Sequence, residues 1–398
     1  MSAKNTQTHN ISQVYSNSAP SLMKVTMDAL SLEDKEVKMP YPFNRTIKRR
    51  ASAPELTPFS ADNDEPYEDG KLLKLMVSDP PRVVTAKIIK CFKPFTMGQV
   101  MLVQILHPTF DLHQTYVLKV FDRRFTEDFR KENRIEEWTR KMDIAYHKFV
   151  FSQAHYDEYR GWLKSRYEHQ EFCENEDEED EDDTSYTSSF VVLCDETFDQ
   201  YFCDRMYRSE RGTYVRLQDL QGRGIPRLIA EVEVPQFKVS TATCTVGSNT
   251  VFLHGVRGIL MQYIKGFSMQ QMYNKPARPC PAPQKYWQDI VDDGIRILET
   301  MRKREILNKD SNVRNTIVRW DPIDEKYKVF LIDFGHCKFK HPDTDLWNWR
   351  KWQALEDEEG AISWFLIHKL EEAYGPSGVK YRPSDYAEAL SDDFNRGD

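Results

Sequence analysis

The sequence predicts an α+β protein in which short β-strands come first and helices dominate the later part. Three β-branched or alternating stretches lie between residues 83 and 121 and are separated by turn residues. Later, residues 286–303 carry apolar side chains on one side of a helix. Strands followed by helices, without regular alternation of the two, are typical of the α+β class.

Length and composition limit the kind of protein this can be. The chain has 398 residues, of which 40% are hydrophobic, enough for one large domain or two modest ones. No stretch approaches the roughly 18 uninterrupted apolar residues of a membrane span, and the polar start lacks the apolar core of a signal peptide. The seven cysteines form no C-x-x-C pair, which favours reduced thiols over a zinc site. We therefore expect an intracellular protein, cytoplasmic or nuclear, with no membrane partner.

The net charge of −8 comes from one segment. Residues 174–183 hold nine acidic residues and no basic one, and without them the rest of the chain carries a net charge of +1. Like charges repel and extend the backbone, so this run predicts a solvated acidic loop. The remaining chain is nearly neutral and gives no indication of nucleic-acid binding.

Residues 1–80 are rich in Ser, Asn, Pro, Asp and Lys and show no sustained period. Too little apolar surface is available there to offset the entropy of ordering, so we expect a disordered N-terminal tail. Within it, Ser52 follows Lys48-Arg49-Arg50-Ala51, which resembles the target of an upstream basophilic kinase. A charged tail without that role is the alternative interpretation.

The first structured part is predicted to be an antiparallel meander. Its strands are expected at residues 83–89, 100–106 and 116–121. In the third strand, alternation puts Lys119 on the face opposite its two apolar neighbours.

Helices and two more strands follow the meander. Residues 127–150 and 155–167 are rich in charge and aromatics and predict two helices. After the acidic run, residues 195–220 predict a helix that ends before two glycines. Strands are expected again at residues 227–234 and 258–264.

The remainder of the chain is predicted to be mainly helical around one hairpin. Residues 286–303 form the amphipathic helix noted above. Residues 316–320 and 328–332 are expected to pair as a hairpin, and helices are expected at residues 345–355 and 356–374.

Three polar residues flank this hairpin in a pattern suited to phosphoryl transfer. Asp310 and Asn315 precede its first strand, and its second strand runs into Asp333-Phe334-Gly335. A carboxylate and an amide at facing hairpin ends can hold Mg²⁺ through oxygen ligands. A second carboxylate just before the amide can orient an attacking hydroxyl and accept its proton.

These residues resemble the protein-kinase superfamily. Asp310 and Asn315 match the Asp-x-x-x-x-Asn spacing of its catalytic loop, and Asp333-Phe334-Gly335 matches its metal-binding tripeptide. Val-Leu-Lys-Val-Phe-Asp around Lys119 and Ile-Leu-Asn-x-Asp before the catalytic loop resemble a divergent fungal-type group of kinase-like proteins. The order of these motifs is preserved from about residue 83 to residue 340.

The resemblance implies a bilobal fold with an antiparallel-sheet N-lobe and a truncated helical C-lobe. The N-lobe would span residues 81–264, with a helical insertion at 126–195, and the C-lobe residues 265–398. The ligands implied are ATP and Mg²⁺.

The resemblance also implies a role for each site residue. Asp310 would be the base, Asn315 and Asp333 would ligate Mg²⁺, and Lys119 would hold the α- and β-phosphates. The adenine would meet the strand end and hinge at Met261, Gln262 and Tyr263, and Gly98 would lie in the phosphate-covering turn.

The ion-pair partner of Lys119 has more than one candidate. The usual kinase spacing points to Glu136 or Glu137. We favour Glu210, because the helix that carries it leads by a short connection into the next strand, as expected for the helix packed on the sheet. The earlier helices and the acidic run would then be the insertion.

The sequence departs from the kinase pattern at several points. Gly98 is the only glycine between residues 92 and 100, so we expect a weak grip on the phosphates. Asn308 and Lys309 replace the His and Arg before the catalytic Asp, and Asn312 replaces a lysine. Only 63 residues follow Gly335, too few for the usual activation segment and peptide-docking helices.

Two functions therefore stand as alternatives. One is an atypical kinase that transfers the γ-phosphate of ATP to a protein Ser/Thr or a small molecule; a small-molecule kinase of the aminoglycoside type is a variant of it. The other is a pseudokinase scaffold that binds nucleotide weakly or not at all and acts through protein contacts.

Overall fold

A computed structural model describes the protein, with gaps, between residues 56 and 384, and the chain divides into two compact units. One unit comprises Thr126–Asp199 with the chain start, and the other comprises Ser52–Phe125 and Gln200–Asp398. The described residues are 56–58, 66–133, 135–151, 157, 160–161, 189–235, 237–239, 255–274 and 280–384. Among them, no helix has the length and apolar character needed to cross a membrane.

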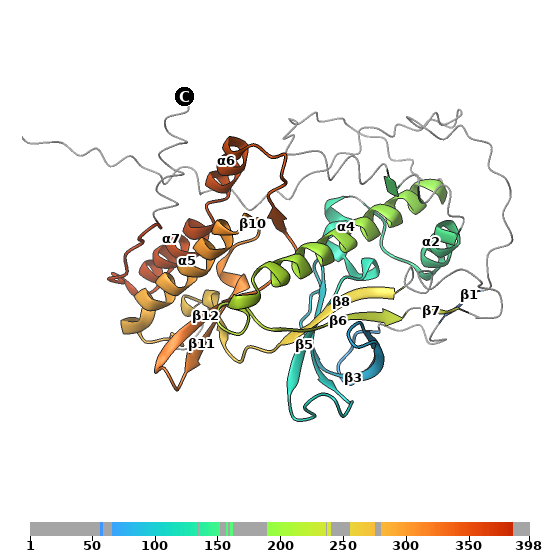
Figure 1. Ribbon diagram of the computed structural model, residues 1–398, viewed down its shortest axis with the longest axis horizontal. Coiled ribbons are helices and arrows are strands. Elements are labelled where there is room, and N and C mark those ends of the chain that lie inside the picture. Colours follow the sequence, from blue (N-terminus) through green and yellow to red (C-terminus); the bar gives the residue numbers. More distant parts are fainter. Residues whose placement is uncertain are drawn as a thin grey trace, which may run out of the picture. The chain divides into compact units, whose positions relative to one another are not determined.

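The second unit contains a closed barrel of six antiparallel strands. Around the barrel the order is β2-β3-β4-β5-β8-β6, and Figure 1 shows β8 next to β6 and β5 close by. The strands are β2 (Leu72–Val77), β3 (Arg82–Cys91), β4 (Gln99–Ile105), β5 (Thr115–Val120), β6 (Leu228–Pro235) and β8 (Gly255–Gln262). The predicted meander is confirmed as β3, β4 and β5, paired in sequence order.

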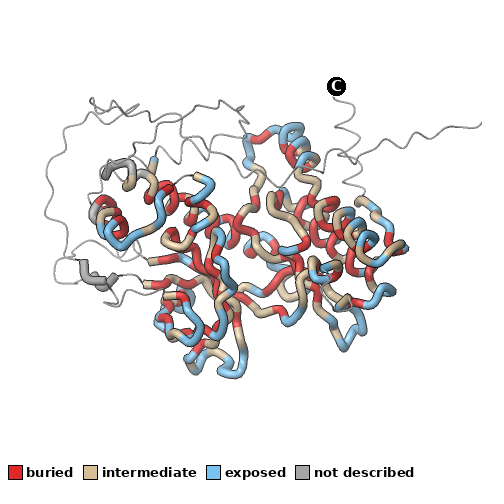
Figure 2. Tube along the Cα trace, turned by 180° about the vertical axis from the view of Figure 1, so that it is seen from behind, coloured by how far each residue is buried: buried red, intermediate tan, exposed pale blue. Residues whose placement is uncertain are grey.

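Alternation of side chains builds the barrel interior. In β4 every second residue is buried, beginning with Gln99 and continuing through Met101, Val103 and Ile105. Successive side chains of a strand point to opposite faces, so one face of each strand fills the interior. Met101, Val103 and Ile105 belong to one hydrophobic core. A second core contains apolar residues of α4, of the later helices and of the hairpin, and Figure 2 shows the buried residues in red.

The prediction of a disordered tail up to residue 80 is wrong for residues 56–58, which form a short strand, and for residues 66–80. Strand β2 lies in this stretch, and its inward side chains Leu73, Leu75 and Val77 are buried in the barrel. Tyr67 is fully buried, and its hydroxyl donates a hydrogen bond to Asp122 Oδ2 at 2.7 Å. Residues 71–77 alternate between exposed and buried side chains. Burial of the inward side chains offsets the entropy cost of ordering this stretch, which its polar neighbours could not do. Ser52 lies outside the described residues.

The first unit contains two helices where one was expected. Residues 127–150 divide into α1 (Glu127–Glu132) and α2 (Arg140–Phe151). The Asn133 side chain donates to the Phe129 carbonyl at 2.8 Å, and Arg130 Nη1 donates to the Glu136 carbonyl at 2.9 Å. Such side-chain bonds compete with helical ones and end α1. Most of the predicted helix at 155–167 and the acidic run lie outside the described residues.

The long helix α4 (Ser189–Arg216) confirms the helix predicted at residues 195–220. It begins six residues earlier than expected, and a short 3-10 turn (Gln218–Leu220) follows it. The chain then returns to the barrel through β6. A short separate sheet pairs β1 (Leu56–Pro58) with β7 (Phe237–Val239).

The later part of the second unit combines helices with short sheets. The predicted hairpin is confirmed, with Thr316 opposite Leu331 and Asp321 opposite Lys326. Three strands of two or three residues were not predicted: β9 pairs with β11, and β10 pairs with β13. The elements are β9 (Phe267–Ser268), α5 (Trp287–Lys303), β10 (Ile306–Asn308), β11 (Thr316–Asp321), β12 (Lys326–Leu331), β13 (Cys337–Phe339), α6 (Leu346–Glu356) and α7 (Glu358–Tyr374).

The helix predicted at 286–303 packs as its pattern indicated. In α5, Ile290, Val291, Leu298 and Met301 are fully buried. They belong to the same core as Ile362 and other apolar residues of α7. Burying each such side chain contributes about 1.5–3 kcal/mol, so this helix pair anchors the elements that follow α5.

Candidate functional site

Lys119 connects three segments that are far apart in the sequence. It lies in β5, between Val100 of β4 and Ile259 of β8. Its Nζ atom lies 2.8 Å from Glu210 Oε2 and 2.6 Å from Asp333 Oδ1. The Lys119 side chain is almost fully buried, so both ion pairs form away from bulk water. Charged hydrogen bonds of this length are among the strongest in proteins.

Glu210 reaches Lys119 from α4. Its side chain is fully buried, and Oε2 also accepts a hydrogen bond from the Phe334 backbone N–H at 2.8 Å. The carboxylate therefore holds both the lysine and the tripeptide that contains Asp333. The other two candidates, Glu136 and Glu137, belong to the first unit and lie in the non-helical link between α1 and α2.

The electrostatics of this triad favour a charged lysine. Burial alone would lower the pKa of Lys119, but the carboxylates of Asp333 and Glu210 outweigh it, and the pKa is raised. Burial would likewise raise the pKa of Asp333, yet the Lys119 ammonium lowers it. For Glu210, burial prevails over the attraction of Lys119, and its pKa is raised.

The backbone around Asp333 places its carboxylate at the lysine. Asp333 has a φ of +64°, in the left-handed region that non-glycine residues rarely adopt. Phe334 is fully buried against Tyr214, with ring centroids 5.5 Å apart in an edge-to-face arrangement. Gly335 packs close to Met206: a Cβ there would lie 2.9 Å from Met206 Cε, the flexible end of that side chain. Packing of the two neighbours thus holds Asp333 in its strained conformation.

Asp310 is held from both sides by amides. Asn312 Nδ2 donates to Asp310 Oδ1 and Asn315 Nδ2 donates to Asp310 Oδ2, both at 2.8 Å. The Asn312 Oδ1 atom caps the short turn that follows, accepting from the Arg314 and Asn315 N–H groups. Asn312, which replaces the lysine expected from the kinase pattern, therefore shapes the loop and positions the carboxylate.

Burial, together with repulsion from the Asp333 carboxylate, raises the pKa of Asp310. The Asn315 hydrogen bond, His336 and Arg314 oppose this increase. A carboxylate with a raised pKa accepts a proton more readily, which suits a general base.

The hairpin brings the Asp310 loop close to the tripeptide. The Ile332 N–H donates to the Asn315 carbonyl at 2.9 Å, so Asn315 and Asp333 lie at the same end of the hairpin. The Asn315 amide nitrogen is directed at Asp310, which leaves its Oδ1 atom as an acceptor. No three His, Cys, Asp or Glu side chains of the described residues are grouped closely enough to hold a metal. A Mg²⁺ ion here would need phosphate and water oxygens in addition, which is its usual coordination at nucleotide sites.

The turn between β3 and β4 is anchored by an aromatic residue. Phe95 is buried in the barrel core, and its ring lies 6.3 Å from that of Tyr67. Gly98 lies beside the lysine: a Cβ there would lie 3.3 Å from Lys119 Cε. Gly98 is therefore the residue of this turn that lies against Lys119, and the buried Phe95 ring fixes the turn on the barrel. The sequence alone did not predict this role of Phe95.

The three residues expected at the adenine lie at the end of β8. Met261 pairs with Val117 and is buried, and its sulfur accepts a hydrogen bond from the Tyr214 hydroxyl at 3.3 Å. Gln262 Oε1 accepts from the Arg227 N–H at 3.2 Å, and Tyr263 is half-buried just beyond the strand. All three are two to four positions beyond Ile259, the partner of Lys119.

His336 is a site residue that sequence reasoning missed. Burial lowers the pKa of His336, although the carboxylates of Asp333 and Asp310 oppose this, so the neutral imidazole is favoured. Its ring lies 6.3 Å from that of Phe202. Its position directly after the Asp-Phe-Gly tripeptide is the signal that could have identified it.

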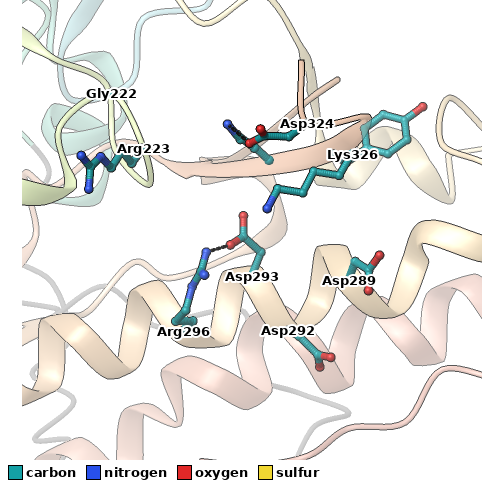
Figure 3. A pocket seen from close by; sticks show the side chains of 10 residues that line it. Gly222, Arg223, Asp289, Asp292, Asp293, Arg296, Asp324 and Lys326 are labelled. Carbon is teal, nitrogen blue, oxygen red and sulfur yellow. Dashed lines mark hydrogen bonds and ion pairs between the residues drawn. The ribbon is translucent and has the colours of Figure 1, made fainter. Parts of the chain in front are cut away.

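A separate open cavity of about 650 Å³ lies between α5, the hairpin turn and the loop after α4 (Figure 3). None of the candidate site residues Lys119, Glu210, Asp310, Asn315 and Asp333 lines it. Several of its charged groups satisfy one another, such as Arg296 with Asp293, and Asp293 Oδ2 accepts from the Val329 N–H at 2.9 Å. The contact between Asp293 and Val329 joins α5 to the hairpin beside the cavity. Its lining residues are Gly222, Arg223, Asp289, Asp292, Asp293, Arg296, Asp324, Lys326, Tyr327 and Lys328.

No protein-family model and no curated protein matches the sequence. Among solved structures, the chain is similar to WaaP in complex with acyl carrier protein, with 11% identity and a TM-score of 0.34 over 77% of this chain and 83% of that one. It is also similar to the ROP18 kinase domain in complex with AMP-PNP and sucrose, with 10% identity and a TM-score of 0.35 over 70% of this chain and 59% of that one. At these TM-scores, neither likeness carries an argument about this chain.

Proposed function

We propose that this chain is a phosphotransferase of the protein kinase-like superfamily, which uses ATP and Mg²⁺ to phosphorylate a hydroxyl group on a protein Ser/Thr or a small molecule. The observation that carries the proposal is the position of Lys119 between Glu210 and Asp333, 2.8 and 2.6 Å away. A buried lysine held by one carboxylate and facing a second, metal-binding one is the arrangement that kinases use for the phosphates of ATP.

Lys119 would hold the α- and β-phosphates, and Glu210 would keep it in place. Glu210 is suited to this because it has no exposure to solvent and also fixes the Phe334 backbone. Lys119 would exchange its bond to Asp333 for one to phosphate, which releases a carboxylate oxygen for the metal.

Asp333 and Asn315 would hold Mg²⁺. The Asp333 side chain is 36% exposed, so an ion can reach it, and the Asn315 amide oxygen is not engaged with Asp310. The metal would neutralise the charge that develops on the transferred phosphoryl group.

Asp310 would orient the acceptor hydroxyl and accept its proton. Its carboxylate is fixed by two amides, and burial beside Asp333 raises its pKa. A positioned base of this kind typically contributes about 10²–10⁴ in rate.

The alternative of a pseudokinase scaffold is favoured by one observation. Asn312 stands where a lysine would assist the γ-phosphate, and its amide engages Asp310 instead. Without that cation, the transition-state charge would depend on Mg²⁺ and Lys119 alone.

The test is the thermal stability of the full chain with ATP, with and without Mg²⁺. Mg-ATP at 100 times its dissociation constant should stabilise the wild type by about 2.7 kcal/mol. Asp333→Asn should lose the Mg²⁺-dependent part of this stabilisation, whereas Asp324→Asn, on the hairpin turn, should keep it. Each variant is compared with itself without ligand, so a general loss of stability does not affect the result. If Mg²⁺ adds nothing to the ATP stabilisation of the wild type, the metal assignment is wrong.

A further inference from the structure

Lys119 and Glu231 lie in one row of side chains on the outer face of the barrel. Ile259 of β8 pairs with Lys119 of β5 on one side and with Glu231 of β6 on the other. Directly opposite residues of neighbouring strands share a face, and the next residues, Leu260 and Val232, belong to the barrel core on the other face. Since neighbouring strands are about 4.8 Å apart, the backbones at Lys119 and Glu231 are about 10 Å apart along the row.

Glu231 holds helix α4 with both of its carboxylate oxygens. The Tyr207 hydroxyl donates to Glu231 Oε2 at 2.8 Å, and Arg211 Nε lies 2.7 Å from Glu231 Oε1. Tyr207 and Arg211 are four positions apart, so they lie on the same side of α4, one turn apart. These residues and the barrel belong to the same compact unit.

Glu210 lies within the turn of α4 that Glu231 holds. It precedes Arg211 directly, and its carboxylate pairs with Lys119 at the other end of the row. The two contacts have opposite polarity, because β5 offers a cation to a helix carboxylate and β6 offers a carboxylate to a helix cation. With one of these contacts alone, the helix could still turn about its axis or slide along it, and the two contacts together prevent both movements.

An aromatic contact also connects Glu231 with Lys119. The Tyr207 ring packs edge-to-face on that of Phe121, with centroids 6.0 Å apart. The Lys119 Nζ atom lies 5.3 Å from the centroid of the same Phe121 ring. The tyrosine that Glu231 holds therefore packs on the ring that lies beside the ammonium.

We propose that Glu231 is a positioning residue for nucleotide binding, which holds α4 in the rotation that places Glu210 on Lys119. This inference rests on the proposed function of Lys119 and Glu210. A role in global stability explains the contact less well, because the Arg211 and Glu231 side chains are 46% and 29% exposed and such ion pairs contribute little to folding.

The experiment is calorimetric titration of the full chain with Mg-ATP. Glu231→Ala should bind Mg-ATP about three- to thirty-fold more weakly than the wild type, the range expected for a residue that acts on a site through its neighbours. Asp219→Ala is the matched control and should leave the affinity unchanged. It removes another partly exposed ion pair, with Arg304 Nη2 at 2.7 Å, on the turn after α4.

A second substitution shows whether Glu231 acts through Glu210. In a Glu210→Ala chain, adding Glu231→Ala should weaken Mg-ATP binding by less than about two-fold, because the residue to be positioned is already absent. Arg211→Ala and Tyr207→Phe each remove one of the two bonds, so each should weaken binding less than Glu231→Ala, and they remain informative if that variant does not fold. Wild-type affinity in all three single variants would overturn the proposal, and so would a full additional loss in the Glu210→Ala chain.

A measurement without nucleotide separates this inference from the proposed function. The rate at which acetic anhydride acetylates the Lys119 amine, followed by mass spectrometry, is low while the amine is buried and paired. Glu231→Ala should raise this rate at least about three-fold, and Asp219→Ala should not. An unchanged rate would overturn the positioning role. A raised rate in a chain whose wild type does not bind Mg-ATP would support the positioning of Glu210 and overturn the proposed function instead.

Discussion

Asp310 combines two properties that a base needs, a fixed position and an elevated pKa. Its two carboxylate oxygens accept from Asn312 and Asn315, and burial beside Asp333 disfavours its charge. Neither amide supplies a net charge, so the carboxylate is oriented without being strongly stabilised as an anion. A fixed carboxylate with a raised pKa is more typical of a proton acceptor than of a partner in a structural ion pair.

The proposed role of Asp310 as the base predicts the outcome of Asp310→Asn. The variant should lose turnover by about 10²–10⁴-fold, because the acceptor hydroxyl loses its base, while ATP affinity changes little. Autophosphorylation or ATPase activity provides the measurement, alongside the thermal shift with Mg-ATP. Asp324→Asn should retain wild-type activity. Wild-type turnover no greater than that of Asp310→Asn would instead favour the pseudokinase scaffold.

The sequence predicted many of the residues that gather at the site, but not how they are supported. Their placement around the hairpin and the resemblance to kinase motifs indicated Asp310, Asn315 and Asp333, because these motifs are local. Glu210 was favoured because of the short connection after its helix, and the structure places it 2.8 Å from Lys119. The anchoring role of Phe95 could not be predicted, because it depends on Tyr67, a residue assigned to the tail.

Two acidic residues at the start of α7 meet one arginine at the end of α5. Arg302 lies 3.2 Å from Glu358 and 2.8 Å from Glu359, and all three side chains are buried. Glu358 Oε1 also accepts from the Asn308 N–H at 2.8 Å, just before the Asp310 loop. One cation cannot fully offset two buried carboxylates, and burial raises the pKa of Glu358 to about 7.

The raised pKa of Glu358 makes stability depend on pH. Its ordinary value is 4.5, so between pH 4.5 and 7 the folded state binds more protons than the unfolded state, and the free energy of unfolding falls as pH rises. The loss from this carboxyl reaches about 3 kcal/mol above pH 7. Glu358→Gln should remove this part of the pH dependence, because glutamine does not titrate. Urea unfolding at pH 5, 6, 7 and 8 gives the free energy of unfolding of the wild type and of Glu358→Gln. If this free energy changes with pH in the same way for both proteins, the prediction is contradicted.

At the scale of elements, long periodic segments were predicted well and very short ones were not. The α5 helix and the β11–β12 hairpin have clear periods over their whole length. Strands β9, β10 and β13 have two or three residues, too few for any alternation to be visible. They exist because distant segments provide backbone partners, as Ile306 and Phe339 do for each other.

At the scale of the whole chain, the barrel depends on residues that the sequence assigned to the tail. Strand β2 pairs with β3 along its full length and with β6 at Met76 and Val77, and the second pairing closes the barrel. Its three inward side chains contribute about 5–9 kcal/mol by burial, a large share of the about 5–15 kcal/mol by which domains are stable.

Two truncations test this dependence. A chain that begins at Pro66 keeps β2 and should retain cooperative unfolding close to that of the full chain. A chain that begins at Pro81 lacks β2 and should unfold at much lower urea concentration or fail to fold. Equal stability of the two truncated chains would show that β2 is dispensable for folding, as expected if residues up to 80 were only a tail. Circular dichroism during urea unfolding supplies the comparison.

The seam between β2 and β6 also sets an order of events during synthesis. Val77 pairs with Val232, which leaves the ribosome 155 residues later, whereas the β2–β3 turn is complete within a few residues. At 5–20 residues per second, the outer edge of β2 waits roughly 8 to 30 seconds for its second partner. During that time β2, β3, β4 and β5 form an open sheet with two unsatisfied edges, because β5 also waits for its partner β8. The nascent chain is therefore most exposed to mispairing before β6 and β8 have been made.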